Sequence, residues 1–224
     1  MRVVNYDASR VTSLFPFEEV IPLSGANDRE IIDAITERYK FLKAPDLAKD
    51  DVAKDGYKFA SGQFTFESSA FRLNDFSIFR DGLVINAATT SGSEAFLHDV
   101  IGFMRERFSF RDFATKPRLF FQSQLVVEFD RPPEKLLRSL DQIVEIISKP
   151  LRETYDTENP MQFSRLDFDF DRSPGTPPIA RLVQRFGIER RVEIPFEKQR
   201  FFCVASMRTS SHIAALEAIE SLID

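Results

Sequence analysis

Four stretches of the chain repeat apolar residues every three or four positions, which is the spacing of an amphipathic helix. They predict helices over residues 28–42, 93–108, 133–149 and 210–223. The third stretch has the clearest period, and its apolar stripe consists of Leu136, Leu137, Leu140, Ile143, Val144 and Ile147. Pro150 follows this stripe and predicts the end of the helix or a kink in it.

Residues 64–78 alternate apolar and polar side chains, as a half-buried β-strand does. The alternation changes phase near Asn74 and Asp75, which predicts a β-bulge, because one inserted residue moves the following side chains to the other face. Asp81 and Gly82 then separate two apolar runs. They predict a tight hairpin, since glycine accepts the positive φ that such a turn requires.

Strands are also expected later in the chain. Residues 119–129 form a strongly β segment, and a further strand is expected over 163–170. A short helix should follow, with Gly187 as its C-terminal cap. The last hairpin is expected to pair residues 191–195 with residues 200–207.

These patterns predict an α+β fold with a mostly antiparallel sheet of about seven or eight strands, covered largely on one face by about four or five helices. We expect residues 1–224 to form a single compact domain. Strand, hairpin and helix follow one another in residues 57–110 and again in residues 161–224, which suggests two related strand-hairpin-helix units. Helix-capping chemistry alone would also produce this resemblance, because a small polar cluster opens the helix in both.

Composition sharpens the prediction for the core. The chain has 24 Phe, 4 Tyr and no Trp, with 43% hydrophobic and 29% charged residues. Such a balance is typical of a folded globular protein, and phenylalanine provides apolar area without a polar atom. Cys203, the single cysteine, lies in an apolar run and is expected to be a buried structural thiol. Without a disulfide, an apolar leader or a membrane span, we expect a cytoplasmic protein.

A row of alternating carboxylates is the first candidate site. Strand alternation would place Asp167, Asp169 and Asp171 on one face, and a neighbouring strand could add Glu128 and Asp130, which have the same spacing. Clustered carboxylates suit Mg²⁺, Mn²⁺ or Ca²⁺, and a bound ion could activate water against a phosphate ester. The alternative is a solvated strand face whose acids pair with arginines, and the sequence favours this second interpretation.

A basic stretch is the second candidate. Residues 181–200 include Arg181, Arg185, Arg190 and Arg191, with phenylalanines between them, and could contact phosphates and stack on bases. The glutamates of the same stretch leave only a small basic excess, and the whole chain carries a net charge of −5. Nucleic-acid binding is therefore not favoured.

Signatures of known catalytic classes are missing from the sequence. There is no Walker A loop, G-x-G-x-x-G, H-E-x-x-H, C-x-x-C or G-x-S-x-G motif. The two histidines, His98 and His212, have ordinary surface and first-turn positions on expected helices. We expect no cofactor.

The sequence therefore favours a non-catalytic subunit that binds a protein partner or associates with itself. Arginine outnumbers lysine by 21 to 9, and arginine and phenylalanine are both favoured in protein interfaces. The first 25 residues contain Pro16 and Pro22 and predict an extended edge segment, with exposed apolar residues near 11–23. A divalent-metal-dependent hydrolase of phosphate esters and a nucleic-acid-binding module are the alternative functions.

Overall fold

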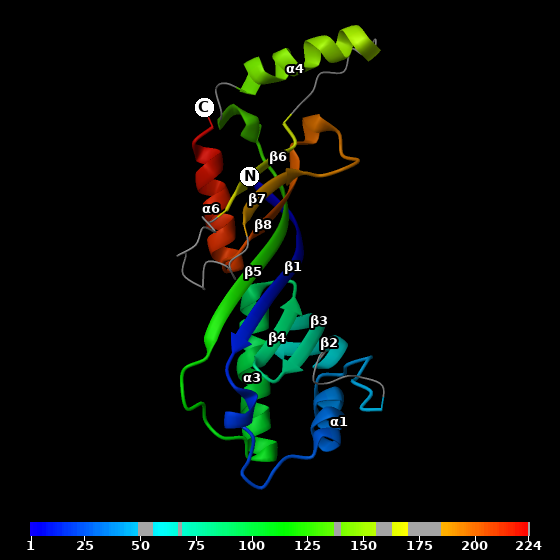
Figure 1. Ribbon diagram of the computed structural model, residues 1–224, viewed down its shortest axis with the longest axis vertical. Helices are drawn as coiled ribbons and strands as arrows, with labels where there is room; N and C mark the ends of the chain where they lie inside the picture. The colour runs from blue at the N-terminus through cyan, green and yellow to red at the C-terminus, as the bar shows by residue number, and fades with distance from the viewer. Residues whose placement is uncertain (49–55, 67–68, 137–139, 156–162, 170–184, 224) are drawn as a thin grey trace. The chain divides into compact units, whose positions relative to one another are not determined.

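The computed structural model describes residues 1–48, 56–66, 69–136, 140–155, 163–169 and 185–223 (Figure 1). This part of the chain contains eight strands and four α-helices, so the α+β fold and the numbers of its elements are confirmed. The strands are β1 (Arg2–Leu14), β2 (Tyr57–Phe66), β3 (Ser69–Phe79), β4 (Gly82–Ala87), β5 (Arg118–Glu128), β6 (Arg165–Phe168), β7 (Phe186–Arg190) and β8 (Arg200–Ala205).

The helices are α1 (Asp28–Arg38), α3 (Thr90–Phe108), α4 (Leu140–Tyr155) and α6 (Thr209–Ser221), with 3-10 turns η1 (Phe17–Glu19), η2 (Pro133–Leu136) and η3 (Phe196–Lys198). Their starts follow local capping chemistry. The side chain of Asn27 accepts hydrogen bonds from the first turn of α1, and that of Thr89 accepts one from Gly92 N–H at the start of α3. Pro150 lies inside α4, so it does not end that helix.

One sheet contains all eight described strands, in the order β2-β3-β4-β1-β5-β8-β7-β6. The β3–β4 register shifts between Leu73 and Asp75, which confirms the bulge. The hairpin at Asp81-Gly82 is also confirmed. Gly82 has φ 144°, and a Cβ atom there would lie 2.0 Å from Ser13 O, so no other residue fits this turn.

The chain divides into two compact units. Unit 1 comprises Met1–Asn5, Gln124–Ala205 and Ser210–Asp224, and unit 2 comprises Tyr6–Ser123 and Ser206–Thr209. Strands of both units nevertheless belong to one sheet. The division into units therefore does not decide the number of domains, and a single domain over residues 1–224 stays a prediction.

The order of elements is the same in both halves of the described chain. β1, α1, β2, β3, β4 and α3 come first, and β5, α4, β6, β7, β8 and α6 repeat that strand and helix order. The second strand of each half pairs with the third, and the third with the fourth, in antiparallel ladders. The sequence resemblance between residues 57–110 and 161–224 covers only the later part of this pattern, and descent from a duplication stays a prediction.

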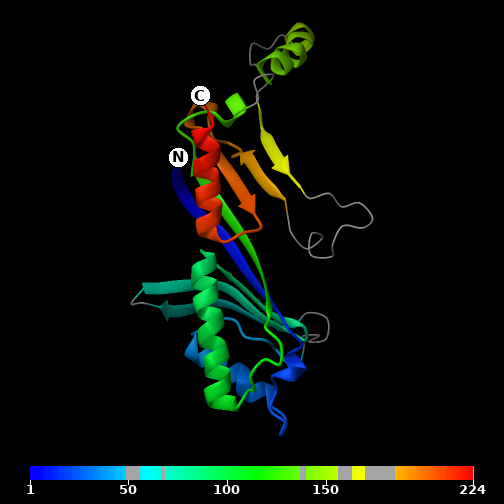
Figure 2. The ribbon, with the colours of Figure 1, turned by 90° about the vertical axis from the view of Figure 1, so that its left-hand side faces the viewer.

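The core of unit 2 is built from aromatic rings. Tyr39, directly after α1, lies 4.8 Å from Phe96 of α3 between ring centroids, and 6.4 Å from Phe64 of β2. Phe76 of β3 lies 5.2 Å from Phe96 and 5.6 Å from Phe59. These contacts place α1 and α3 against the same face of the strands, and α3 lies along that face in Figure 2. The predicted phenylalanine-rich core is confirmed.

The core of unit 1 lies between β5, β7, β8 and α6. Leu125, Ile188, Phe201 and Leu216 are fully buried there, together with Cys203. Burial raises the pKa of the Cys203 thiol, which keeps the group protonated and unreactive. The prediction of a buried structural thiol is confirmed.

The prediction of an N-terminal edge segment is wrong. β1 lies between β4 and β5 in the sheet, and Val11, Phe15 and Val20 are buried in the core of unit 2. Pro16 and Pro22 come after the end of β1, so neither removes a hydrogen bond from the ladder. Leu23 is 91% exposed, but the burial of Val11, Phe15 and Val20 removes most of the exposed apolar surface expected near residues 11–23.

The prediction for Gly187 is also wrong. This residue lies in β7, which pairs with β8, so the last hairpin joins residues 186–190 to residues 200–205 instead of beginning at 191. A Cβ atom at Gly187 would lie 2.7 Å from the Asp167 carboxylate of the neighbouring strand. The glycine therefore leaves room for the Asp167 carboxylate beside β7 and does not cap a helix.

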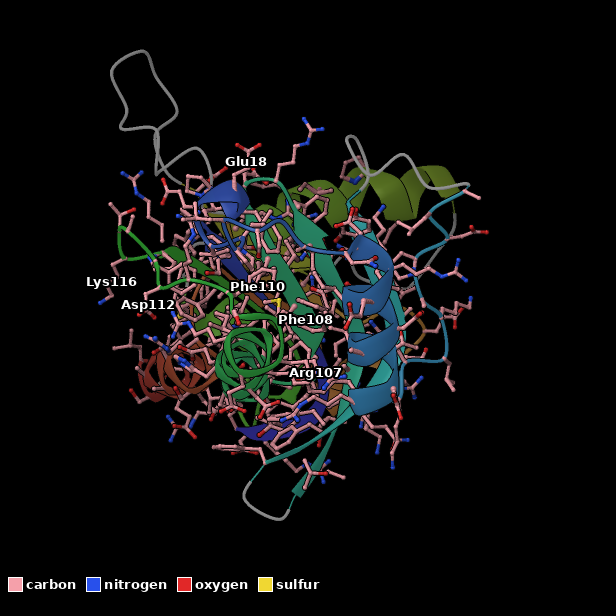
Figure 3. All side chains as sticks on the ribbon, turned by 90° about the horizontal axis from the view of Figure 1, so that it is seen from below. Glu18, Arg107, Phe108, Phe110, Asp112 and Lys116 are labelled. Carbon is pink, nitrogen blue, oxygen red and sulfur yellow. The ribbon has the colours of Figure 1, made fainter. Side chains whose placement is uncertain are left out.

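The C-terminal end of α3 is closed by the segment that follows it. The Phe110 ring lies 5.9 Å from that of Phe17, and Arg111 donates hydrogen bonds to the carbonyl oxygens of Glu18 and Ile21. Figure 3, which views unit 2 from this end, shows Phe108 and Phe110 beside the end of α3 and Glu18 on η1. No helix in the described ranges combines the length and apolarity needed to cross a membrane.

Candidate interaction surface

Asp167, the acid of β6, is engaged by two arginines. Asp167 lies 2.5 Å from Arg165 Nε and 3.3 Å from Arg185 Nε. Asp169 is exposed just after β6 and also has an interaction partner. Asp171 lies outside the described residues. Asp167 therefore has the environment of a charge-paired strand face.

The two acids of the other strand are engaged as well. Glu128 lies 2.9 Å from Arg200 and 3.0 Å from Arg2, and the hydrogen bond from Arg200 is the main reason why the pKa of Glu128 is lowered. The α-amino group of Met1 lies 2.7 Å from Asp130, and its hydrogen bond lowers the pKa of that carboxyl group.

The expectation that Glu128 and Asp130 lie on a strand next to the β6 acids is wrong. β8 and β7 lie between β5 and β6, so the two sets of carboxylates are not on adjacent strands. Across the described residues no group of three or more His, Cys, Asp or Glu side chains could hold a metal ion. The row of Asp167, Asp169 and Asp171 stays a prediction as a set, because its last member is not described.

The four arginines of the basic stretch have different environments. Arg190 is 8% exposed, and its guanidinium lies 4.4 Å from the Phe196 ring and 4.7 Å from the Phe201 ring. Arg185 pairs with Asp167, whereas Arg191 is exposed. Arg181 lies outside the described residues. The contacts of Arg190 with the two rings give this arginine a structural role. Nucleic-acid binding by residues 181–200 stays a prediction.

Sequence comparison adds no family to this picture. The chain matches no protein-family model, and no curated protein sequence is significantly similar to it. The function must therefore be argued from the side chains that the fold exposes.

The most prominent exposed apolar side chains on a helix belong to α4. Ile146 is 72% exposed and Ile147 is 45% exposed. We call these two residues the α4 apolar face. The helical period of residues 133–149 predicted an apolar stripe that includes Ile147 but not Ile146, and it did not predict that either residue would be exposed.

Charged residues flank the α4 apolar face in an asymmetric way. Asp141 and Glu145 belong to the first half of the helix, and Lys149, Arg152 and Glu153 to the second, so the sequence charge is −2 in the first half and +1 in the second. Arg152 lies 2.6 Å from Glu145. Lys149 is exposed and forms no ion pair with any residue that the structure describes. The helix thus has an acidic first half and a basic group available in its second half.

Proposed function

We propose that this protein is a non-catalytic assembly subunit that associates with itself through the α4 apolar face. The observation that carries the proposal is the exposure of Ile146 and Ile147. An isolated helix of about 15 residues is only marginally stable in water, and most helices gain stability by burying an apolar face. A surface that covers these isoleucines would therefore stabilise α4.

A second copy of α4 is the occupant that fits the charges. If two such helices pack antiparallel, the acidic half of each lies against the basic half of the other. Glu145 of one copy then faces the Lys149 of its partner, which has no ion pair of its own within the described chain. Antiparallel packing also opposes the two helix dipoles, so the end charges are complementary.

The size of the contact between two α4 helices sets the expected strength of self-association. A helix of 16 residues is about 24 Å long at about 1.5 Å per residue. A pair of such helices buries less than the roughly 1,200–2,000 Å² of a stable complex. We therefore expect a weak dimer whose population depends on protein concentration.

Sedimentation equilibrium over a wide concentration series tests this proposal. The wild type should show a reversible monomer–dimer equilibrium, and Ile147→Glu should shift it to monomer by placing a charge in the apolar contact. Leu23→Glu is the matched control, because Leu23 is 91% exposed and lies outside α4. Circular dichroism verifies that each variant is folded.

Two results would contradict self-association. One is a wild type that stays monomeric at every concentration. The other is an Ile147→Glu variant that dimerises as strongly as the wild type, because the contact would then lie elsewhere.

A further inference from the structure

A surface pocket of about 410 Å³ lies in unit 2 between the turn after α1 and the β2–β3 hairpin. This volume falls within the roughly 300–1,000 Å³ range of small-molecule sites. Its lining residues include Lys40, Leu42, Ser61, Gln63, Phe71 and Arg72. None of the described residues that line it is acidic.

The two cations of this pocket are not neutralised. Neither Lys40 nor Arg72 forms an ion pair with another residue in the described ranges. Other arginines of unit 2 do have carboxylate partners: Arg38 pairs with Asp99, and Arg208 pairs with Glu94. In a chain with a net charge of −5, two unpaired cations at one pocket favour an anionic ligand.

Two residues that line the pocket, Lys40 and Ser61, have unusual backbone conformations. Lys40 has φ 51° and Ser61 has φ 58°. Both values lie in the left-handed region, which residues other than glycine seldom adopt. Two backbone hydrogen bonds join the segments that contain them: Leu42 N–H donates to Ser61 O at 3.2 Å, and Gln63 N–H donates to Tyr39 O at 2.7 Å.

Lys40 follows the C-cap of α1, where Phe41 N–H donates to Thr36 O at 3.1 Å. Ser61 is skipped between the Ala60–Asp75 and Gly62–Leu73 pairs of the β2–β3 ladder. The helix end and the strand irregularity therefore shape this wall of the pocket.

The remaining lining adds apolar contact and neutral polar groups. Leu42 is 83% exposed and presents carbon surface to a ligand, whereas the Phe71 ring lies over Gly92 of α3, on the other face of β3 from Arg72. Ser61 supplies a hydroxyl and Gln63 a carboxamide, and Gln63 is paired directly with Arg72 across the two strands. An anionic head group near the cations and an apolar body against Leu42 would use both kinds of lining.

We infer that this pocket binds a small organic anion in which a carboxylate or phosphate group is attached to an apolar ring or chain. Arg72 and Lys40 contact the anionic group through charge-assisted hydrogen bonds. Leu42 contacts the apolar part. The inference is independent of self-association, because the pocket belongs to unit 2 and α4 belongs to unit 1.

The test is a titration with probe ligands, monitored by amide chemical shifts in NMR. Phenyl phosphate and benzoate separate the two anionic head groups. Benzyl alcohol supplies the ring without charge, and inorganic phosphate supplies the charge without the ring. At least one aromatic anion should shift the amide signals of Ser61 and Gln63, and should bind more tightly than either control probe.

Substitutions in the pocket then test which side chains contact the anionic group of the probe. Arg72→Gln and Lys40→Asn should each weaken binding about tenfold or more, because each removes one charged donor. Asparagine is chosen for position 40 because it tolerates a positive φ. Lys43→Gln is the matched control, since Lys43 is a nearby exposed lysine outside the pocket lining, and it should bind as the wild type does.

Three results would overturn the inference. They are no shift with either aromatic anion, equal binding of benzyl alcohol, and undiminished binding by both pocket variants. The Ile147→Glu variant should bind the probes like the wild type. A failure of self-association and a failure of the pocket are therefore distinguishable.

Discussion

The hydroxyl of Tyr39 donates a 2.6 Å hydrogen bond to Asp99 Oδ2 on α3. Arg38 donates to both oxygens of the same carboxylate at 3.2 Å, and its guanidinium lies 4.7 Å from the Phe103 ring. The end of α1 is thereby attached to the middle of α3 by polar contacts at the border of an aromatic core. Burial, followed by the hydrogen bond to Asp99, raises the pKa of Tyr39.

Removing the Tyr39 hydroxyl should destabilise the protein. Tyr39→Phe keeps the buried ring but removes a hydrogen bond to a charged group, which typically contributes about 1.5–3 kcal/mol. We expect the lower part of that range, because the Asp99 side chain is 31% exposed. Urea denaturation followed by circular dichroism measures the change, since the chain has no tryptophan. Tyr6→Phe is the control: Tyr6 is 43% exposed, and this change should leave the midpoint unaltered.

His212 should make the protein less stable in mild acid. The side chain is fully buried against Phe186, neither ring nitrogen has a hydrogen-bond partner among the described residues, and burial lowers the pKa of His212 to about 4. In mild acid the His212 imidazole therefore binds a proton in the unfolded chain but stays neutral in the folded chain. The stabilising contribution is complete above about pH 6.5 and decreases as the pH falls toward about 4, by at most about 1.4 kcal/mol per pH unit.

The pH dependence of the unfolding free energy checks this prediction. His212→Gln should flatten the slope between about pH 6.5 and about pH 4. His98→Gln should keep it, because His98 is exposed. A wild-type slope that survives in the His212 variant would assign the acid sensitivity to other groups.

Thr90 and Thr209 should be energetically coupled. Thr90 N–H donates to Thr209 Oγ1 at 3.1 Å, Thr209 N–H donates to Thr90 Oγ1 at 2.9 Å, and the two hydroxyls lie 3.2 Å apart. Both residues are buried, so Thr90→Val or Thr209→Val should each cost about 1–3 kcal/mol by leaving an amide without its acceptor. The double variant should lose less than the sum, because the bond between the hydroxyls is lost only once.

A double-mutant cycle of unfolding free energies measures this coupling. Thr65→Val is the control, since Thr65 is exposed on β2 and should give a change near zero. Strict additivity of the two core substitutions would contradict the reciprocal contact.

Arg190 should contribute more to stability than Arg191. Besides its two ring contacts, Arg190 donates hydrogen bonds to the carbonyl oxygens of Phe163 at 3.1 Å and Phe196 at 3.2 Å. Arg190→Met retains side-chain length but leaves those contacts unmade, so we expect a loss of about 2 kcal/mol or more. The exposed Arg191→Met should stay within about 0.5 kcal/mol. Thermal unfolding compares the two, and equal effects would show that burial does not distinguish them.

Local features of this protein were readable from the sequence because their causes are local. The bulge near Asp75, the turn at Gly82 and the capping of α3 follow from neighbouring side chains and backbone geometry. The burial of Cys203 and the aromatic core follow from composition and apolar runs. Helix periods located α1, α3 and α6 to within four residues at each end, whereas α4 begins at Leu140 instead of 133 and continues past Pro150 to Tyr155.

Only the tertiary structure decided which segments meet. It placed β1 inside the sheet, separated the acids of β5 from those of β6 by two strands, and enclosed Arg190 between two rings. It also left Ile146 exposed and brought Lys40 and Arg72 to one pocket. Side-chain periodicity records which face of an element is apolar. It does not record the neighbour of that face, because strand order and helix packing depend on contacts between residues far apart in the chain.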